Sequence, residues 1–196
     1  IQKNKVKVGL IGGSGYTGGE LIRLLINHSK VELVFVQSKT NKGKHIQEVH
    51  ADLIGQTEIK FVSKIDDKID LLFMCVGHGK SKEFLDKNKI QRKIKIIDLS
   101  QDFRVGSIYN ERKFIYGLPE LNKDEIIKSY SIANPGCFAT VIQLGLLPFA
   151  VNNDLNGDIN INAITGSTGA GVKLSDTSHY SWRNNNVSWY KSFNHQ

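Results

Sequence analysis

Short apolar runs alternate with amphipathic stretches along the first half of the chain. The runs that predict strands cover residues 6–11, 31–37, 70–76 and 94–98, and the stretches with helical spacing cover residues 19–28 and 80–90. Alternation of this kind is typical of βαβ units, whose parallel strands are apolar throughout because helices cover both faces of the sheet. We therefore expect an α/β fold with a doubly wound parallel sheet.

The second half of the chain follows a different pattern. In residues 101–130 the alternation loosens, which predicts a loop-rich stretch. Residues 138–150 predict a helix that Pro148 breaks, because proline lacks the N–H that the helix ladder requires. An alternating strand is expected at 159–162, followed by a glycine-rich loop at 166–171.

A composition shift near residue 150 predicts a domain boundary. A chain of 196 residues, 40% of them apolar and 23% charged, is long enough to bury a core. We expect residues 1–149 to form a dinucleotide-binding domain that ends in the segment around Cys137. Residues 150–196 then begin an α+β second domain that looks incomplete.

Charge and cysteine content narrow the class of protein. The net charge is +7, mainly from scattered lysines, but no basic stripe interleaved with aromatic residues indicates a nucleic-acid partner. Cys75 and Cys137 lie in unlike settings without a C-x-x-C pattern, so we expect neither a disulfide nor a metal site. The apolar runs are shorter than the roughly 20 residues of a membrane span, and no leader precedes the first strand. We expect a cytoplasmic protein without a membrane partner.

The glycine-rich segment 12–19 follows the first predicted strand and opens the first predicted helix. Its Gly13-x-Gly15-x-x-Gly18 spacing is the dinucleotide fingerprint of a Rossmann-type domain, and here it stands in the strand-turn-helix context that the fingerprint requires. Glycines at such a turn let backbone N–H groups approach a pyrophosphate at the positive end of the helix dipole. A tight turn without a ligand is the alternative.

The end of the second strand indicates which dinucleotide binds. NAD-binding domains carry an acidic residue there that accepts hydrogen bonds from the ribose 2′-OH. This chain offers no acid at that place, but instead Ser38, Lys39, Thr40, Lys42 and Lys44. A 2′-phosphate suits these residues, so we expect NADP(H), with a merely solvated lysine loop as the alternative.

Cys137 follows Asn134-Pro135-Gly136 and directly precedes the apolar helix. A thiol at a helix N-terminus is stabilised as the thiolate by the dipole and the free N–H groups. A thiolate combined with a nicotinamide indicates attack on an acyl phosphate, followed by reduction of the thioester. The position alone leaves a structural role open, which is the role that suits Cys75 inside its apolar strand.

Six segments together resemble the N-acetyl-γ-glutamyl-phosphate reductase family, whose superfamily includes the aspartate-semialdehyde dehydrogenases. They are 12-GGSGYTGGEL-21, 77-GHGKS-81, 98-DLSQDFR-104, 116-YGLPEL-121, 134-NPGCFAT-140 and 166-GSTGAG-171. The resemblance covers nearly the whole chain, and it implies an NADPH-dependent reduction of N-acetyl-γ-glutamyl phosphate to the semialdehyde through a Cys thioester, as a step of arginine biosynthesis.

The resemblance also implies roles for individual residues. It makes Cys137 the nucleophile and places the base on His195, shortly after Tyr190. The implied cofactor contacts are Gly12, Gly13, Ser14, Gly15, Tyr16, Thr17, Gly18, Ser38, Lys39 and Gly169, and the implied substrate contacts are Ser100, Arg104, Asn134, Gly166 and Ser167. Arg104 can equally pair with Glu120.

Several alternatives stay open at this point. From the residues alone, the base can also be His78 or His179 and, with less support, His28, His45 or His50. Family members are longer than this chain and form homo-oligomers, dimers or tetramers, so the resemblance implies that the chain is truncated at its C-terminus. An aspartyl phosphate reductase and a catalytically silent dinucleotide-binding fragment are the two competing hypotheses.

Overall fold

The structure is a computed structural model that describes residues 5–106 and 108–189. It divides into two compact units, Ile1–Asn160 and Ile161–Gln196, which are described separately below. None of the helices in the described part of the chain is long and apolar enough to cross a bilayer.

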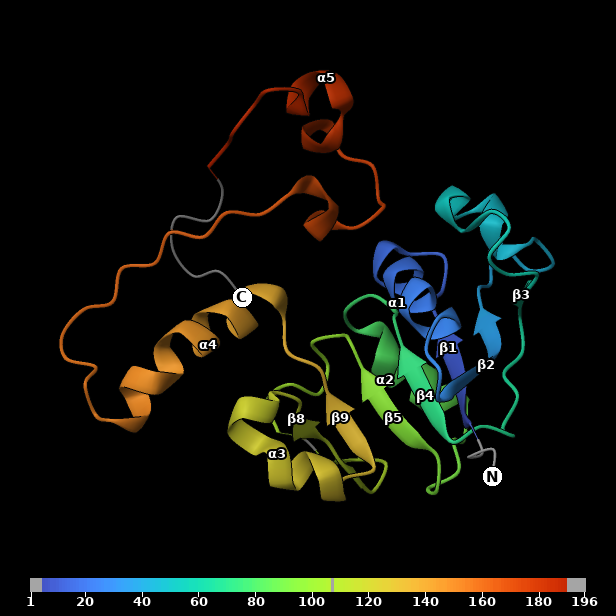
Figure 1. The fold of residues 1–196 in the computed structure, drawn as a ribbon, viewed down its shortest axis with the longest axis horizontal. Coiled ribbons are helices and arrows are strands. Elements are labelled where there is room, and N and C mark those ends of the chain that lie inside the picture. The colour runs from blue at the N-terminus through green and yellow to red at the C-terminus, as the bar shows by residue number, and fades with distance from the viewer. Residues whose placement is uncertain (1–4, 107, 190–196) are drawn as a thin grey trace. The chain divides into compact units, whose positions relative to one another are not determined.

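The first unit is built on a seven-stranded parallel sheet (Figure 1). Its strands are β1 (Val6–Ile11), β2 (Val31–Gln37), β3 (Phe61–Val62), β4 (Leu71–Met74), β5 (Lys95–Asp98), β8 (Ile115–Tyr116) and β9 (Ser131–Ala133). They run in the order β3-β2-β1-β4-β5-β9-β8, and each pair of neighbours is parallel. The α/β class with a Rossmann-type parallel sheet is confirmed.

Helices and short turns connect these strands. They are α1 (Tyr16–Ile26), α2 (Lys80–Lys87), α3 (Pro119–Lys128), α4 (Cys137–Val151) and the 3₁₀ turns η1 (Ile46–Glu48) and η2 (Ala51–Leu53). A hairpin of β6 (Ile108–Tyr109) and β7 (Arg112–Lys113) forms a separate antiparallel pair.

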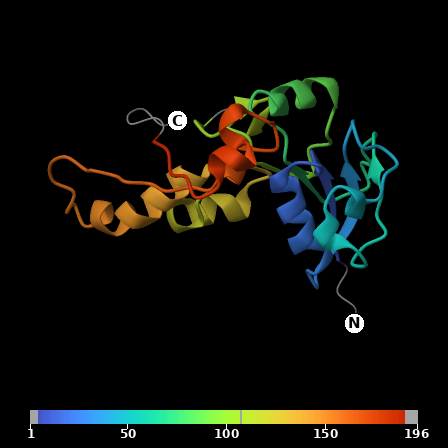
Figure 2. The ribbon, with the colours of Figure 1, turned by 90° about the horizontal axis from the view of Figure 1, so that it is seen from above.

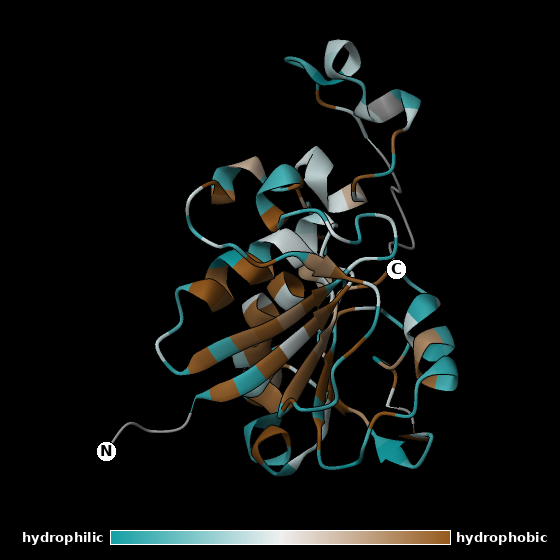
Figure 3. Ribbon diagram, turned by 90° about the vertical axis from the view of Figure 1, so that its right-hand side faces the viewer, coloured by the Kyte–Doolittle hydropathy of each residue, from teal (hydrophilic) through white to brown (hydrophobic). Residues whose placement is uncertain are grey.

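Two hydrophobic clusters cover opposite faces of the sheet. Alternation along β1 sends Val8 and Leu10 into a cluster with Ile22 of α1, whereas Ile11 joins a second cluster with Leu85 of α2. Helix α1 therefore covers one face and α2 the other, and the strands lie between them as the hydrophobic part of the unit (Figure 3). This two-sided burial explains why the strands read as continuous apolar runs.

The strand order reverses between β1 and β4. From β1 the chain moves outward to β2 and β3, then returns to add β4 on the opposite side of β1. In open α/β sheets a ligand binds at such a switch point, beyond the carboxyl ends of the strands. The glycine turn follows β1 at this point, so the topology places it at the mouth of the crevice.

One expectation about the middle of the chain is wrong and another is incomplete. The helix that contains Pro148 does not break there, because α4 continues to Val151. Pro148 lies in the last turn, so less than one further turn of helix follows it. The loop-rich stretch 101–130 also contains β6, β7, β8 and α3, and α3 starts with Pro119 in its first turn, a position that tolerates proline.

The expected strand at 159–162 is also absent. These residues carry an alternating pattern, but they pair with no strand in the described part of the chain. An isolated strand leaves its backbone groups unpaired, so the pattern alone does not stabilise one.

In its described residues, 161–189, the second unit contains short helical pieces joined by irregular segments (Figure 2). These pieces are η3 (Ser167–Ala170), η4 (Asp176–Ser178) and α5 (Tyr180–Arg183). The glycine-rich loop expected at 166–171 includes η3.

Asp102 caps helix α2 from the neighbouring loop. Its carboxylate accepts hydrogen bonds from the backbone N–H groups of Gly79 at 2.6 Å and of Ser81 and Lys82 at 3.1 Å each. These are the amides that the start of a helix leaves without an internal partner. We expect Asp102→Ala to lower the free energy of unfolding by about 1–2 kcal/mol, measured by urea denaturation.

Asp102→Asn is the matched control, because its amide oxygen still accepts a hydrogen bond and only the charge is lost. Its destabilisation should be smaller than that of Asp102→Ala. Equal urea midpoints for Asp102→Ala and the parent protein would contradict the capping role.

Candidate active site

The backbone of the glycine turn packs closely against the end of β4. Gly12 has a φ of +76°, and a Cβ atom there would lie 2.4 Å from the carbonyl oxygen of Cys75 at the end of β4. The N–H groups of Gly12 and Gly13 both donate to the Gln37 carbonyl at 3.1 Å, which ties the turn to β2. The turn is thereby fixed between the two strands that flank β1, and a residue with a side chain does not fit at Gly12.

Helix α1 begins directly after this turn. Gly15 is its N-cap and supplies no side-chain acceptor, so the first amides of the helix, those of Tyr16, Thr17 and Gly18, have no capping group. Backbone N–H groups and the helix dipole together favour an anion at that point. The structure thus gives segment 12–18 the geometry that a pyrophosphate requires.

The end of β2 lies beside the glycine turn. Ser38 is buried, and its hydroxyl donates to the Ser14 hydroxyl at 3.1 Å. Lys39 follows on the exposed side of the chain. The structure thus joins two of the expected cofactor residues, Ser14 and Ser38, in one hydrogen bond.

His50 contacts the glycine turn, although nothing in the sequence pattern indicates this contact. Its Nε2 lies 2.7 Å from the Gly13 carbonyl oxygen, so the ring donates through Nε2–H. Its segment is held to α1 by an ion pair between Arg23 and Asp52 with a separation of 2.6 Å. No local motif signals this role, because 37 positions separate His50 from Gly13.

A buried carboxylate organises the loop after β5. Asp98 is fully buried and accepts hydrogen bonds from the hydroxyls of Ser81 and Ser100. Burial raises the pKa of the Asp98 carboxyl, although the two hydroxyls act in the opposite direction. Ser100 is itself buried, and its oxygen also accepts the N–H of Asp102 at 3.0 Å. Its hydroxyl is therefore engaged within the protein, and a substrate contact for Ser100 stays a prediction.

Arg104 links two loops at the same edge of the sheet. Its Nε donates to the Asn134 carbonyl and its Nη2 donates to the Leu99 carbonyl, both at 2.9 Å. These carbonyl groups are its partners in place of the Glu120 carboxylate considered above. Arg104 and Asn134, two expected substrate residues, are in direct contact.

The two cysteines have opposite environments. Cys137 is the first residue of α4, and its side chain is exposed. Cys75 follows β4 directly, and burial raises the pKa of its thiol to about 12. Cys75 therefore stays protonated at neutral pH, which leaves Cys137 as the thiol that is accessible for chemistry.

The candidate bases are scattered. His78 accepts the backbone N–H of Gln101 through Nδ1 at 3.1 Å, which places it beside the loop that carries Ser100. His179 caps α5 in the second unit. His195, and Tyr190 before it, lie outside the described residues, so the assignment of His195 as the base stays a prediction.

The remaining expected site residues belong to the second unit. Gly166 is the N-cap of η3, and Ser167 and Gly169 lie within that turn. All three are exposed. Their contacts with cofactor or substrate stay predictions.

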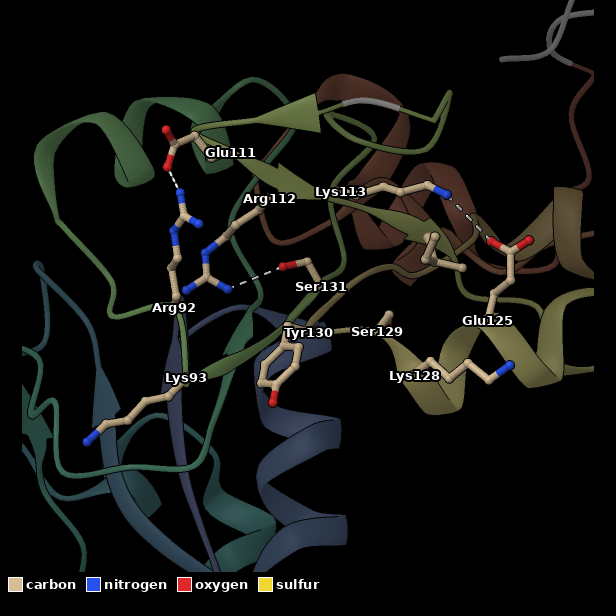
Figure 4. A pocket seen from close by; sticks show the side chains of 11 residues that line it. Arg92, Lys93, Glu111, Arg112, Lys113, Glu125, Lys128, Ser129, Tyr130 and Ser131 are labelled. Atoms are coloured by element: carbon tan, nitrogen blue, oxygen red, sulfur yellow. Dashed lines mark hydrogen bonds and ion pairs between the residues drawn. The ribbon is translucent and has the colours of Figure 1, made fainter.

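A cavity of about 690 Å³ lies at the opposite, amino-terminal end of the strands (Figure 4). It is lined by Arg92, Lys93, Glu111, Arg112, Lys113, Ile115, Glu125, Lys128, Ser129, Tyr130 and Ser131. Arg112 is buried there and donates to backbone carbonyls, including that of Gln91 at 2.6 Å. The cavity shares no residue with the glycine turn or the Cys137 segment.

The parallel sheet, the glycine turn at its switch point and the helix-terminal thiol together define a dinucleotide-binding domain of the Rossmann class. Residues 7–129 match the family model described as "Semialdehyde dehydrogenase, NAD binding domain", and residues 137–196 match "Semialdehyde dehydrogenase, dimerisation domain". The chain therefore belongs to the semialdehyde dehydrogenase family.

Curated relatives confirm the resemblance drawn from the sequence motifs. The chain is 56% identical over 193 residues to an N-acetyl-gamma-glutamyl-phosphate reductase of Flavobacterium johnsoniae, and 55% identical over 192 residues to one of Bacteroides thetaiotaomicron. In both cases the match covers 97% of this chain and 59% of the relative. The chain thus spans less than two thirds of the length of these relatives.

Solved structures of similar fold include aspartate semialdehyde dehydrogenase II from Vibrio cholerae, with a TM-score of 0.59 and 18% identity over 76% of this chain and 43% of that one. Aspartate semialdehyde dehydrogenase with NADP from Candida albicans gives a TM-score of 0.57 with 14% identity, over 78% of this chain and 48% of that one. At these identities the likeness concerns the fold alone.

The contact of His50 with the glycine turn generates a prediction about dinucleotide affinity. Because the ring holds the Gly13 carbonyl, His50→Ala should loosen the turn and raise the Kd for NADPH by about three- to tenfold, the worth of one hydrogen bond. Fluorescence titration with NADPH measures this effect.

Two variants control for the loss of the side chain. His50→Gln keeps an N–H donor at similar reach and should retain most of the affinity. His28→Ala should have no effect, because the His28 ring accepts the N–H of Lys30, near the C-terminal end of α1, and lies away from the glycine turn. Unchanged affinity in His50→Ala would show that the contact does not support the turn.

Proposed function

We propose that the full-length protein is an NADPH-dependent reductase that converts N-acetyl-γ-glutamyl phosphate to N-acetylglutamate semialdehyde and phosphate. The observation that carries this proposal is an exposed thiol, Cys137, at the N-terminus of α4, on the same edge of the sheet as the glycine turn. The substrate is inferred from the names of the relatives. Over the matched part, these relatives share more than half of their residues with this chain.

The donors of the first unit suit a dinucleotide with a 2′-phosphate. The uncapped amides at the start of α1 suit the pyrophosphate, and Ser38 and Lys39 lie where the ribose of the adenosine half is expected. No acidic residue takes the place of the 2′-OH acceptor between residues 36 and 44. We therefore assign NADP(H), with Gly12 to Gly18, Ser38 and Lys39 as its contacts in this unit and Gly169 as a contact from the second unit.

The reaction divides into two steps at the Cys137 sulfur. The thiolate attacks the acyl carbon, a C–S bond forms, and the C–O bond to phosphate breaks. A base takes the Cys137 thiol proton before the attack, and the departing phosphate leaves with that proton. NADPH, when bound, supplies a hydride that reduces the thioester carbon. The oxyanion that hydride addition leaves then collapses, so that the C–S bond breaks, the aldehyde is released and the thiolate is restored. The N-terminal amides of α4 lie beside Cys137, where they suit the oxyanion of both tetrahedral intermediates.

The other roles follow the same proposal. His195 is the proposed base, and Ser100, Arg104, Asn134, Gly166 and Ser167 are the proposed substrate contacts. We place the domain boundary between residues 149 and 150 and the protein in the cytoplasm, as a homo-oligomer. The match of residues 137–196 to a dimerisation domain supports self-association.

Replacement of the nucleophile tests the proposal. In the full-length protein we expect Cys137→Ser to lower turnover of N-acetyl-γ-glutamyl phosphate by at least about a thousandfold while NADPH affinity changes little. Cys75→Ala is the matched control and should keep turnover, because the raised pKa of the Cys75 thiol, about 12, keeps it protonated at neutral pH. NADPH oxidation followed at 340 nm gives the rate.

Two further comparisons define specificity. NADH in place of NADPH should reduce kcat/KM by about tenfold or more, since it lacks the phosphate that Lys39 would hold. Equal rates with aspartyl phosphate would favour the aspartate-semialdehyde dehydrogenase alternative. Undiminished turnover in Cys137→Ser would refute the thioester route.

A further inference from the structure

The Arg104 guanidinium is already engaged by the protein on two sides. Nε donates to the Asn134 carbonyl and Nη2 to the Leu99 carbonyl, each at 2.9 Å. Leu99 follows β5, and Asn134 lies three residues before Cys137. One planar group therefore bridges the loop after β5 to the loop that leads into the nucleophile.

The loop that carries Arg104 packs against the core and is hydrogen-bonded to it. Phe103, the preceding residue, is buried and stacks on Phe114 with ring centroids 3.9 Å apart. Earlier in the same loop, the Asp98 carboxylate binds the Ser100 hydroxyl at 2.7 Å. Arg104 therefore extends from a loop that is anchored at two points, and its hydrogen bond to the Asn134 carbonyl connects that loop to the segment at 134–136.

Gly136 lies against the same guanidinium. A Cβ atom at Gly136 would come within 2.9 Å of Nη1 of Arg104 and 3.5 Å of its Cζ. The Gly136 carbonyl in turn accepts the N–H of Thr140 at 2.8 Å, which forms part of the first turn of α4. Contact between Arg104 and Gly136 therefore reaches the start of the helix on which Cys137 stands.

The location of the charge argues against a purely stabilising role. The N-terminus of a helix is electropositive, so a cation beside it is unfavourable for stability. The first turn of α4 carries no acidic residue that would offset this cost. A guanidinium kept at this point suits a site where an anion forms during the reaction, as at a thiolate or an acyl phosphate.

We propose that Arg104 is a positioning residue for the nucleophile, holding segment 134–136 so that Cys137 meets the acyl carbon in the productive orientation. The inference rests on the proposed function and extends it. A substrate contact requires only that the Arg104 guanidinium reach the substrate, whereas positioning requires its hydrogen bonds to the Asn134 and Leu99 carbonyls. Asn134 and Leu99 bind Arg104 through their backbone carbonyls, so their side-chain types do not indicate these hydrogen bonds in the sequence.

Arg104→Lys separates positioning from charge. Lysine keeps the positive charge that attracts a phosphate, but a single ammonium cannot reproduce the planar pair of donors that reach Asn134 and Leu99. In the full-length protein we expect kcat to fall on the order of tenfold to a hundredfold, while the KM for the acyl phosphate changes less than about threefold. A raised KM with an unchanged kcat would overturn positioning in favour of a substrate clamp alone.

Gly136→Ala supplies a second, coupled variant. The added methyl group would collide with the Arg104 guanidinium and displace it. We therefore expect Gly136→Ala and Arg104→Ala to lower kcat by similar factors. In the double variant Arg104→Ala/Gly136→Ala the obstruction is gone, so the double loss should not exceed that of Arg104→Ala alone. Multiplied losses would show that the two residues act independently and would overturn the proposal. Gly145→Ala and Arg92→Ala are the matched controls, because Gly145 has no neighbour near its Cβ position and Arg92 lines the remote cavity.

Hydrogen exchange tests the positioning role of Arg104 without measuring turnover. In Arg104→Ala, peptides covering residues 131–140 should exchange on the order of tenfold faster, while peptides covering α1 keep the parent rate. Unchanged exchange at 131–140 overturns positioning even if the protein reduces the acyl phosphate. Faster exchange there in a protein that does not reduce the acyl phosphate would support the positioning contact and reject the proposed function.

Discussion

Parallel pairing of β1 with both β2 and β4 is the constraint on which the rest of the structure depends. Parallel strands end at one common edge, so the segments that follow them meet there however far apart they lie in the sequence. The glycine turn follows β1, Ser38 follows β2, Arg104 lies beyond β5, and Cys137 follows β9. Gly12 allows the turn to lie against the Cys75 carbonyl, because any residue type with a Cβ atom would clash with that oxygen.

Much of this architecture was predictable from periodicity and glycine spacing. Residues 6–11 and 31–37 form strands within the bounds expected from their apolar runs, because burial on both faces leaves a strong signal. Short elements were missed. β8 and β9 contain two and three residues, too few to show a period, and the alternating segment 159–162 has no partner strand in the described part of the chain.

The candidate site was predictable where it depends on motifs and not where it depends on tertiary contacts. The Cys137 helix start and the Ser38 position follow from local sequence. His50 under the glycine turn and Arg104 on the Leu99 and Asn134 carbonyls do not, because their partners are backbone atoms, which every residue offers. The same reason explains Asp102, whose role as a cap is visible only after β5 and α2 are brought together.

In the proposed route Cys137 becomes acylated by an acyl phosphate, the mixed anhydride of a carboxylic acid and phosphoric acid, before any hydride is transferred. The most direct measurement is mass spectrometry of the full-length protein mixed with N-acetyl-γ-glutamyl phosphate in the absence of NADPH, followed by peptide mapping. We expect one N-acetylglutamyl group on the peptide that contains Cys137, none on Cys75, and loss of that group when NADPH is added. Failure to acylate Cys137, or acylation of another residue in its place, would contradict it.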